Sequence, residues 1–154
     1  MRELGEDIKK DPTALQRIST VSSHGVGKSA LAAMLINWFM STRYMANMVI
    51  TANTATQLYT KTFREVSIWS DLSLTKFMFE VTATKMQHRT HKDWVCNAIP
   101  FNEQKPESIA GAHGEHIMLL FDEASGIPQN IYESCYGAMS TPGAIWATFG
   151  NGTK

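Results

Sequence analysis

The spacing of apolar residues switches between a strand pattern and a helix pattern along the first half of the chain. A β-branched run over 17–22 predicts one strand, and the apolar run over 46–51 predicts a second, buried strand. Between them, apolar residues recur at steps of three and four and predict a helix over 28–41, with a core-facing stripe of Ala30, Leu31, Met34, Leu35, Trp38 and Phe39. A further helix is predicted from a cap at Asn53 or Thr54 to about Trp69. This alternation of strand and helix predicts right-handed βαβ units and a parallel sheet.

The second half of the chain is richer in strands. The most apolar short run, 117–121, lies between Gly114 and Asp122 and predicts a central strand. Two strands over 77–86 and 93–101 are expected to form an antiparallel hairpin, and a polar loop follows over 102–114. A helix is expected over 128–139 and a last strand over 144–149. The first ten residues are polar and predict a short helix, which a turn at Asp11-Pro12 follows.

Composition bounds the class of protein. A length of 154 residues suits one domain, and 44% hydrophobic with 18% charged residues is typical of a globular chain. The 14 basic and 14 acidic residues balance, so bulk charge predicts no attraction to nucleic acid or to an anionic membrane. A local basic patch or an oligomeric channel stays compatible with this balance.

The two cysteines and the N-terminus suggest a compartment. Cys96 and Cys135 are far apart and form no disulfide framework, which favours a reducing intracellular setting. The charged N-terminus is unlike a signal peptide, and the apolar stretch 31–40 is too short to cross a bilayer. We therefore expect no membrane partner.

A glycine-rich octet joins the first predicted strand to the first long helix. It reads Ser22-Ser23-His24-Gly25-Val26-Gly27-Lys28-Ser29, the strand–loop–helix order of a phosphate-binding P-loop (Walker A). Its glycines allow backbone N–H groups to surround an anion, and the helix dipole points to the same place. Lys28 is expected to bind the β- and γ-phosphates of ATP, and the Ser29 hydroxyl to bind Mg²⁺. Ser22 departs from the glycine of the general pattern, and an ordinary helix-capping turn is the alternative.

Two acids end the predicted central strand, in the manner of a Walker B motif. We expect this strand to lie beside the P-loop strand, with Asp122 supporting Mg²⁺ and Glu123 deprotonating the attacking water. Successive strand residues point to opposite faces, so both acids serve one site only if the chain turns at once, as Ala124-Ser125-Gly126 permits. The alternative is a solvated acidic pair.

Phosphoryl transfer also calls for a positive charge on the γ-phosphate in the transition state. The candidates for this arginine finger are Arg17, Arg43 and Arg64, and Arg64 is preferred because its helix follows the second strand. A neighbouring subunit is another source. Two weaker constellations, His88 and His91 with Cys96, and His113 with His116, lack a full set of zinc ligands and are expected to be loop residues.

Together these stretches give the chain a family likeness. It resembles the ATPase domain of the large terminase subunit of tailed bacteriophages, the motor that packages DNA into procapsids. The likeness rests on residues 23–29, 49–54 with Gln57 and Lys61-Thr62, 108–113, and 120–128, and a fifth stretch, 148–151, is similar to the family's coupling motif.

The resemblance implies a fold, a reaction and partners. The expected fold is α/β, a P-loop NTPase three-layer sandwich with a mainly parallel central sheet, an inserted antiparallel hairpin and an extra strand between the two nucleotide motifs. The implied activity is Mg-dependent ATP hydrolysis coupled to translocation of viral double-stranded DNA. In this reaction the resemblance implies that Glu123 and Lys28 are catalytic and that residues 23–29 bind the nucleotide. It also implies that Ser29 and Asp122 bind Mg²⁺ and that Asn151 senses the γ-phosphate. Implied partners are the portal protein of the procapsid, a small terminase subunit and further copies in a ring, in the host cytoplasm.

Several departures from the family pattern shape the remaining expectations. His24 stands where many members carry an arginine, and the segment before the P-loop, which usually contacts adenine, is short. The acidic nuclease cluster has no counterpart, so residues 1–154 are expected to form a single ATPase domain, a fragment of a longer chain, without nuclease activity. The alternative functions are a helicase-like, nucleic-acid-stimulated P-loop ATPase and a non-catalytic nucleotide-binding remnant.

Overall fold

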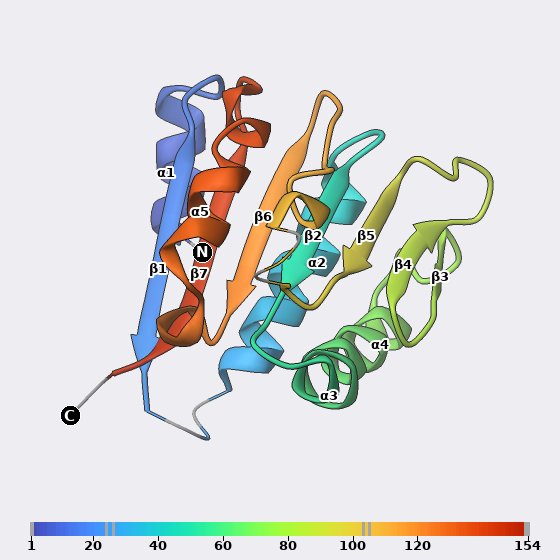
Figure 1. The fold of residues 1–154 in the computed structure, drawn as a ribbon. Helices are drawn as coiled ribbons and strands as arrows, with labels where there is room; N and C mark the ends of the chain where they lie inside the picture. The colour runs from blue at the N-terminus through green and yellow to red at the C-terminus, as the bar shows by residue number, and fades with distance from the viewer. Residues whose placement is uncertain (1, 24, 26, 103, 105, 153–154) are drawn as a thin grey trace.

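A seven-stranded sheet forms the centre of the computed structural model, which describes residues 2–23, 25, 27–102, 104 and 106–152. The strand order is β1-β7-β6-β2-β5-β4-β3 (Figure 1), with bounds β1 Gln16–Ser22, β2 Asn47–Thr51, β3 Phe79–Val81, β4 Lys85–His88, β5 Val95–Ala98, β6 Ile117–Asp122 and β7 Ile145–Asn151. The strands from β1 to β5 in this order pair in parallel, whereas β4 pairs antiparallel with both β5 and β3. The predicted mainly parallel α/β sheet with an antiparallel hairpin is therefore confirmed.

Helices cover both faces of the sheet and complete three layers (Figure 1). The helical elements are α1 Arg2–Lys10, α2 Lys28–Thr42, α3 Ala55–Gln57, the π-helical turn η1 Leu58–Thr62, α4 Phe63–Leu72 and α5 Gln129–Cys135, with short 3-10 turns η2 Pro106–Ser108, η3 Ala124–Gly126 and η4 Ala138–Ser140. Because alternate strand residues point to opposite faces, β6 contributes to two cores. Met118 and Leu120 pack in the core with α2 and α4, while Leu119 and Phe121 pack in the core with α5.

Strand β6 is buried at every position from Ile117 to Asp122. This burial explains its continuous apolar run, because a strand covered on both faces cannot alternate with polar residues. Its neighbours are β7 and β2, however, so the expectation that it lies directly beside the P-loop strand is wrong. Strand β7 lies between β1 and β6, which fits the extra strand that the family resemblance implied.

The predicted strand over 77–86 is also wrong, because the chain reverses inside it. Residues 79–81 and 85–88 form two antiparallel strands, and Thr82 holds the turn between them. The Thr82 N–H donates to the Lys85 carbonyl at 2.8 Å, and the Thr82 hydroxyl oxygen accepts from the Lys85 N–H at 3.2 Å. Alternation of apolar residues continues across such a turn, so the spacing alone does not distinguish one long strand from two short ones.

Two helices differ in detail from their predictions. The segment from Ala55 to Leu72 is helical as expected and Thr54 caps it, but it contains the π-helical turn η1, which periodicity does not reveal. The predicted helix over 128–139 ends at Cys135 and is followed by the separate turn η4.

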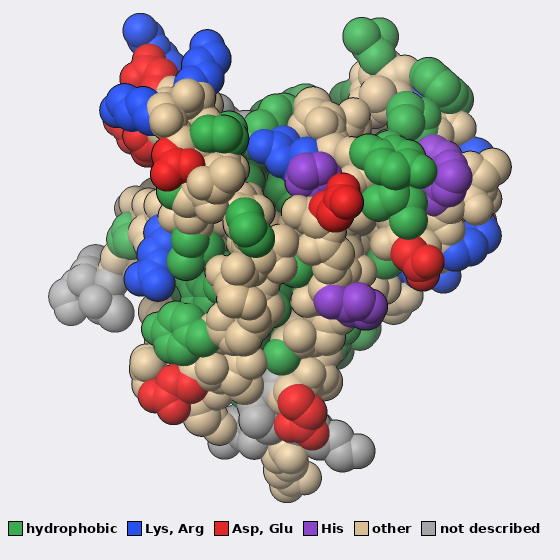
Figure 2. All heavy atoms as spheres, turned by 90° about the horizontal axis from the view of Figure 1, so that it is seen from above, with side chains coloured by type: hydrophobic (Ala, Val, Ile, Leu, Met, Phe, Trp, Pro, Cys, Tyr) green, Lys and Arg blue, Asp and Glu red, His purple; other side chains and the backbone are tan. Residues whose placement is uncertain are grey.

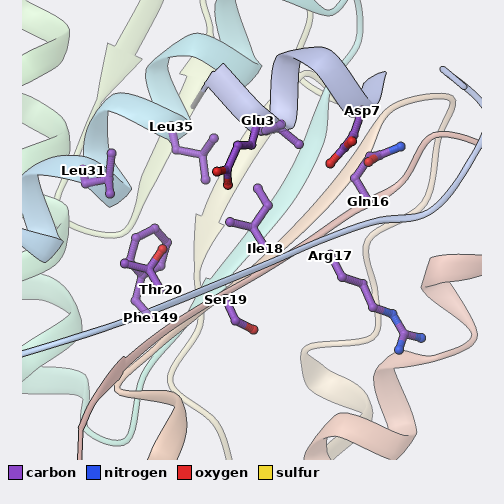
Figure 3. A pocket seen from close by; sticks show the side chains of 11 residues that line it. Glu3, Asp7, Gln16, Arg17, Ile18, Ser19, Thr20, Leu31, Leu35 and Phe149 are labelled. Carbon is purple, nitrogen blue, oxygen red and sulfur yellow. The ribbon is translucent and has the colours of Figure 1, made fainter. Parts of the chain in front are cut away.

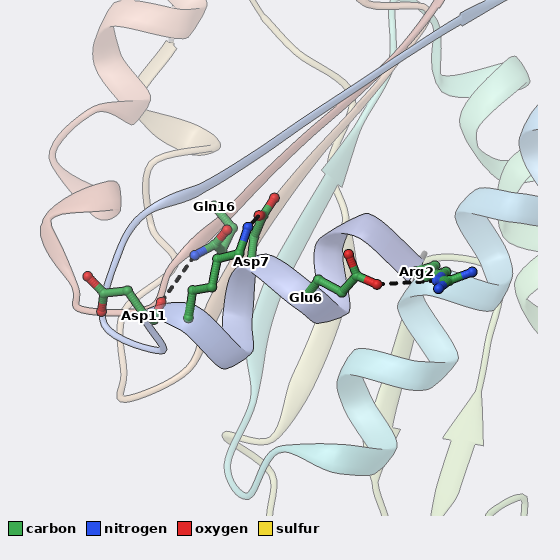
Figure 4. A network of polar contacts seen from close by, with 6 residues as sticks. Arg2, Glu6, Asp7, Asp11 and Gln16 are labelled. Carbon is green, nitrogen blue, oxygen red and sulfur yellow. Dashed lines mark hydrogen bonds and ion pairs between the residues drawn. The ribbon is translucent and has the colours of Figure 1, made fainter.

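Helix α1 lies against strand β1 through Leu4 and carries mixed charge on its outer side. Arg2 pairs with Glu6 at 3.2 Å, and the Gln16 amide donates to the Asp11 carbonyl at 3.3 Å after the turn (Figure 4). Viewed from above, at the end opposite the carboxyl ends of the parallel strands, basic and acidic side chains gather together over the α1 corner (Figure 2). Within the described residues, no helix is long and apolar enough to cross a membrane.

Candidate functional site

The loop between β1 and α2 has the backbone of a phosphate cradle. Gly25 and Gly27 adopt φ of 76° and 88°, a left-handed conformation that residues with a Cβ rarely adopt. Helix α2 begins at Lys28, directly after Gly27, so its free N–H groups point toward the loop. His24 and Val26, also predicted to bind nucleotide, lie outside the described residues.

One cavity of about 280 Å³ collects most of the predicted site residues. Its walls come from the P-loop and the start of α2, from the helical segment after β2, and from the ends of β6 and β7; they comprise Gly25, Gly27, Lys28, Ser29, Ala30, Gln57, Lys61, Glu65, Asp122, Glu123 and Asn151. The carboxyl ends of parallel strands meet at this edge, where α/β proteins bind ligands. Ser23 does not line the cavity, but its carbonyl accepts a hydrogen bond from Lys28.

Asp122 is buried at the carboxyl end of β6, with 3% of its surface exposed. One carboxylate oxygen, Oδ2, accepts a 2.5 Å hydrogen bond from the Thr62 hydroxyl, and Oδ1 accepts a 3.0 Å bond from the Glu123 N–H. Burial raises the pKa of this carboxyl above its usual range, while the two hydrogen bonds and the Lys28 charge act in the opposite direction. The carboxylate is thus held in place on both oxygens.

Glu123 turns into the same cavity because its backbone is left-handed, with φ 53° and ψ 44°. The 3-10 turn η3 follows at once and supplies the immediate change of direction that the two-acid hypothesis required. A non-glycine residue in this region is uncommon and costs backbone energy, as is frequent at active sites. The turn is packed closely: a Cβ at Gly126 would lie 1.9 Å from the Asn53 amide nitrogen.

Asn151 ends β7 and lies opposite Ser22 at the end of β1. The side-chain oxygens of both residues are buried and have no hydrogen-bond partner within the described part of the chain, and the same holds for Thr51 and Asn53 at the end of β2. Buried polar atoms normally have partners. Of these four residues only Asn151 lines the cavity, beside Lys28, Asp122 and Glu123, where its side chain fits a polar ligand with a bound cation.

The three candidate arginines all lie elsewhere. Arg64 lines a groove between α4 and the β3–β4 turn, and Arg43 packs over the Trp38 ring at 4.3 Å. Arg17 lies on β1 beside the cavity between α1 and β1, but its side chain points away from α1, which carries Glu3 and Asp7 (Figure 3). The structure therefore brings none of these three side chains into the cavity that Lys28 and Asp122 line.

Four residues of the helical segment after β2 were not assigned a role from the sequence. Gln57, Lys61 and Glu65 line the cavity, and Thr62 bonds to Asp122. The signal was present, since Gln57 and Lys61-Thr62 belong to the stretches that carry the family resemblance. Their direction could not be predicted because the π-helical turn changes which residues face the sheet edge.

The histidines form no metal centre within the described residues, where no group of three potential ligands converges. His88 instead stacks on Trp94 at 4.7 Å, and its Nδ1 accepts from the Thr90 and His91 N–H groups. Burial, followed by the nearby His91 and Lys92, lowers the pKa of His88.

The sequence of the chain is similar to those of known proteins. Residues 20–148 match the family described as RNA cytidine acetyltransferase NAT10/TcmA, helicase domain. A probable large terminase subunit of Enterobacteria phage P7 is 29% identical in an alignment of 132 residues that covers 79% of this chain and 26% of that protein. The chain thus spans about a quarter of the length of this curated relative.

Solved structures give the same picture of the fold. The large terminase of the thermophilic bacteriophage D6E superposes with a TM-score of 0.65 at 17% identity, over 88% of this chain and 34% of that one. The complex of the D6E large terminase with ADP superposes with a TM-score of 0.63 at 16% identity, over 93% of this chain and 34% of that one. A mutant ATPase domain of the Thermus phage P74-26 large terminase superposes with a TM-score of 0.60 at 16% identity, over 96% of this chain and 63% of that one.

These likenesses agree with the mixed α/β fold of the chain. The predicted P-loop NTPase fold is confirmed by the terminase ATPase domains that share it. The matched family model covers most of the chain, and the phage relative and the solved structures bear out the terminase resemblance. The chain therefore belongs to the family of the NAT10/TcmA helicase domain, and its likeness to the ATPase domain of large terminase subunits is confirmed.

Proposed function

We propose that this chain binds ATP with Mg²⁺ in the cavity at the carboxyl edge of the sheet and hydrolyses it. The observation that carries the proposal is the convergence of Lys28, Ser29, Asp122, Glu123 and Asn151, which come from three distant segments of the chain, on one cavity. Phosphates need a cation and free N–H groups, and hydrolysis needs a base beside them. The cavity provides a residue of each kind.

Each residue has a proposed role in this reaction. Lys28 balances the charge of the β- and γ-phosphates, and the N–H groups at the start of α2 bind their oxygens. Ser29 and Asp122 hold Mg²⁺, which neutralises the charge that develops on the phosphates. Glu123 accepts a proton from the attacking water. Asn151 lines the cavity at the end of β7, where its amide NH2 group donates to the terminal phosphate and so senses whether that phosphate is present.

The work driven by this hydrolysis is proposed to be the packaging of viral double-stranded DNA. The likeness to a phage large terminase supports this, together with the D6E terminase structure that holds ADP. The motor would act as a ring of copies on the portal of a procapsid, in the host cytoplasm, with a small terminase subunit that selects the DNA. The chain itself would supply the ATPase step.

Thermal unfolding with and without Mg-ATP tests the nucleotide site, because a ligand that binds only the folded state raises the melting temperature. We expect a rise for the wild type and none for Lys28→Ala. Phosphate release then tests catalysis, and Glu123→Gln should bind Mg-ATP without turnover. An unchanged melting temperature in the wild type would contradict the proposal.

A second candidate function is a helicase-like ATPase that nucleic acid stimulates, which the family match over residues 20–148 favours. Stimulation of phosphate release by portal-bearing procapsids, beyond the effect of free duplex DNA, supports packaging. Equal stimulation by any duplex supports the helicase-like function. Binding of Mg-ATP without turnover, alone or with DNA, would indicate a nucleotide-binding remnant.

A further inference from the structure

The π-helical turn η1 directs Thr62 toward the end of β6. An α-helix rotates by about 100° per residue, and the wider π turn changes the direction of every side chain that follows it. Thr62 closes this turn and is fully buried, whereas its neighbour Lys61 is exposed and lines the nucleotide cavity. Single π turns of this kind are frequent at functional sites.

The contact that results joins two segments sixty residues apart. The Thr62 Oγ1 atom donates to Asp122 Oδ2 at 2.5 Å, and both side chains are buried. A hydroxyl has one proton to donate, and it is used here. The β-branched threonine has few χ1 rotamers, so the direction of this bond is well defined.

The other carboxylate oxygen is fixed as well, by the Glu123 N–H at 3.0 Å. Each carboxylate oxygen has two lone pairs, so one protein hydrogen bond on each leaves one acceptor position free on each. The Thr62 bond therefore selects which lone pairs of Asp122 point into the cavity that Lys28 and Ser29 line.

We propose that Thr62 is a positioning residue that orients the Asp122 carboxylate toward the cation of the bound nucleotide. This inference rests on the proposed ATPase function and adds to it a residue from outside the two nucleotide motifs. Groups that hydrogen-bond to a metal ligand typically change metal affinity or activity by about 10- to 100-fold when removed.

The test compares two threonine-to-valine variants, because valine keeps the shape of threonine and removes only the hydroxyl. Thr62→Val removes the bond to Asp122. Thr51→Val is the matched control, since Thr51 is equally buried at the end of β2 but its hydroxyl has no partner within the described residues. Binding of fluorescent ADP is measured over a range of Mg²⁺ concentrations and in EDTA, next to the Mg²⁺ dependence of phosphate release.

We expect Thr62→Val to need at least about tenfold more Mg²⁺ for half-maximal nucleotide binding and turnover, with binding in EDTA unchanged. Thr62→Ser, which restores the hydroxyl, should recover most of the wild-type Mg²⁺ dependence, and Thr51→Val should match the wild type. If Thr62→Val does not fold, Thr62→Ala, which adds no bulk, replaces it, and the Mg²⁺ dependence of Thr62→Ala is compared with that of Thr62→Ser.

Three outcomes would overturn the inference. An unchanged Mg²⁺ dependence in Thr62→Val, with normal wild-type binding, refutes the positioning role and leaves the ATPase proposal intact. Equal losses in Thr62→Val and Thr51→Val, or a loss that persists in EDTA, show that the hydroxyl serves only the fold. A wild type without Mg²⁺-dependent nucleotide binding refutes the proposed function and this inference together.

Discussion

The Lys28 ammonium group donates a hydrogen bond of 2.7 Å to the carbonyl oxygen of Ser23. A second bond, of 3.0 Å, goes to the carbonyl of Ser22. The cation thus closes the P-loop on itself by bonding to two carbonyls at the end of β1. Phosphate oxygens would compete with these carbonyls, and because they carry full negative charge they are the stronger partners.

Replacement of Lys28 tests whether this cation binds the nucleotide. Lys28→Ala should abolish the Mg-ATP-dependent rise in melting temperature and weaken nucleotide affinity by tenfold or more, about 1.4 kcal/mol. Lys10→Ala, which removes an exposed lysine of α1, is the control and should keep the full rise. Titration of fluorescent ADP by anisotropy checks both, and equal affinities would contradict the assigned role.

Glu123 combines a proposed catalytic carboxylate with an unfavourable backbone conformation, φ 53°. Glu123→Gly should raise stability by about 1 kcal/mol, because glycine adopts this conformation without strain. Glu123→Gln keeps the strain and should leave stability nearly unchanged. Both variants should lower phosphate release by about 10²- to 10⁴-fold, the usual contribution of a general base.

Thermal unfolding and a phosphate-release assay measure these two effects separately. A glycine variant less stable than the glutamine variant would show that the left-handed turn stores no strain. Full turnover in either variant would show that Glu123 is not the base.

Lys61 and Arg64 provide a matched pair of cations on one helical segment, and of the two only Lys61 lines the proposed nucleotide cavity. Lys61→Ala should lower kcat, because it removes a positive charge near the phosphates, and we expect a loss of about tenfold or more. Arg64→Ala should leave the turnover of the isolated chain unchanged. The reverse result, measured by steady-state phosphate release, would restore Arg64 as the arginine finger.

Gly126, in the turn after the two acids, lies against the Asn53 side chain that follows β2. Gly126→Ala should cost about 1 kcal/mol of unfolding free energy, because its Cβ would meet the Asn53 amide nitrogen and displace the end of that side chain. Asn53→Ala alone should cost little, since its Oδ1 has no partner within the described residues. The double variant should therefore be more stable than Gly126→Ala, and denaturant unfolding of all four proteins measures the coupling. Strictly additive effects would exclude this contact.

The two cysteines should be unreactive in the folded chain. Burial raises the pKa of Cys135 to about 11 and raises that of Cys96 as well, so near pH 8 both are thiols and not the nucleophilic thiolates. Reactivity toward DTNB should stay low until pH approaches the raised value, and both groups should react at once in denaturant. Rapid labelling of either cysteine in the native chain at pH 8 would contradict this burial.

Local pattern was enough to predict most of the parallel sheet and to select residues that the fold brings to one cavity. The P-loop, the buried strand before Asp122 and the turn after Glu123 are short, continuous stretches, and each has the residue types that its backbone requires. A glycine at positive φ or a strand covered on both faces leaves its mark in adjacent residues.

Tertiary structure decided the relationships between distant segments. The sequence alone determined that a glycine-rich loop before a helix and two acids after a buried strand belong to one α/β chain. Only the fold placed β7 between their strands and gave Asp122 a partner at Thr62. It also moved the three candidate arginines away from the cavity and brought Lys61 into it. The physical reason is that strand order and the rotation of a π turn depend on packing across the whole sheet, and no local spacing of apolar residues records either one.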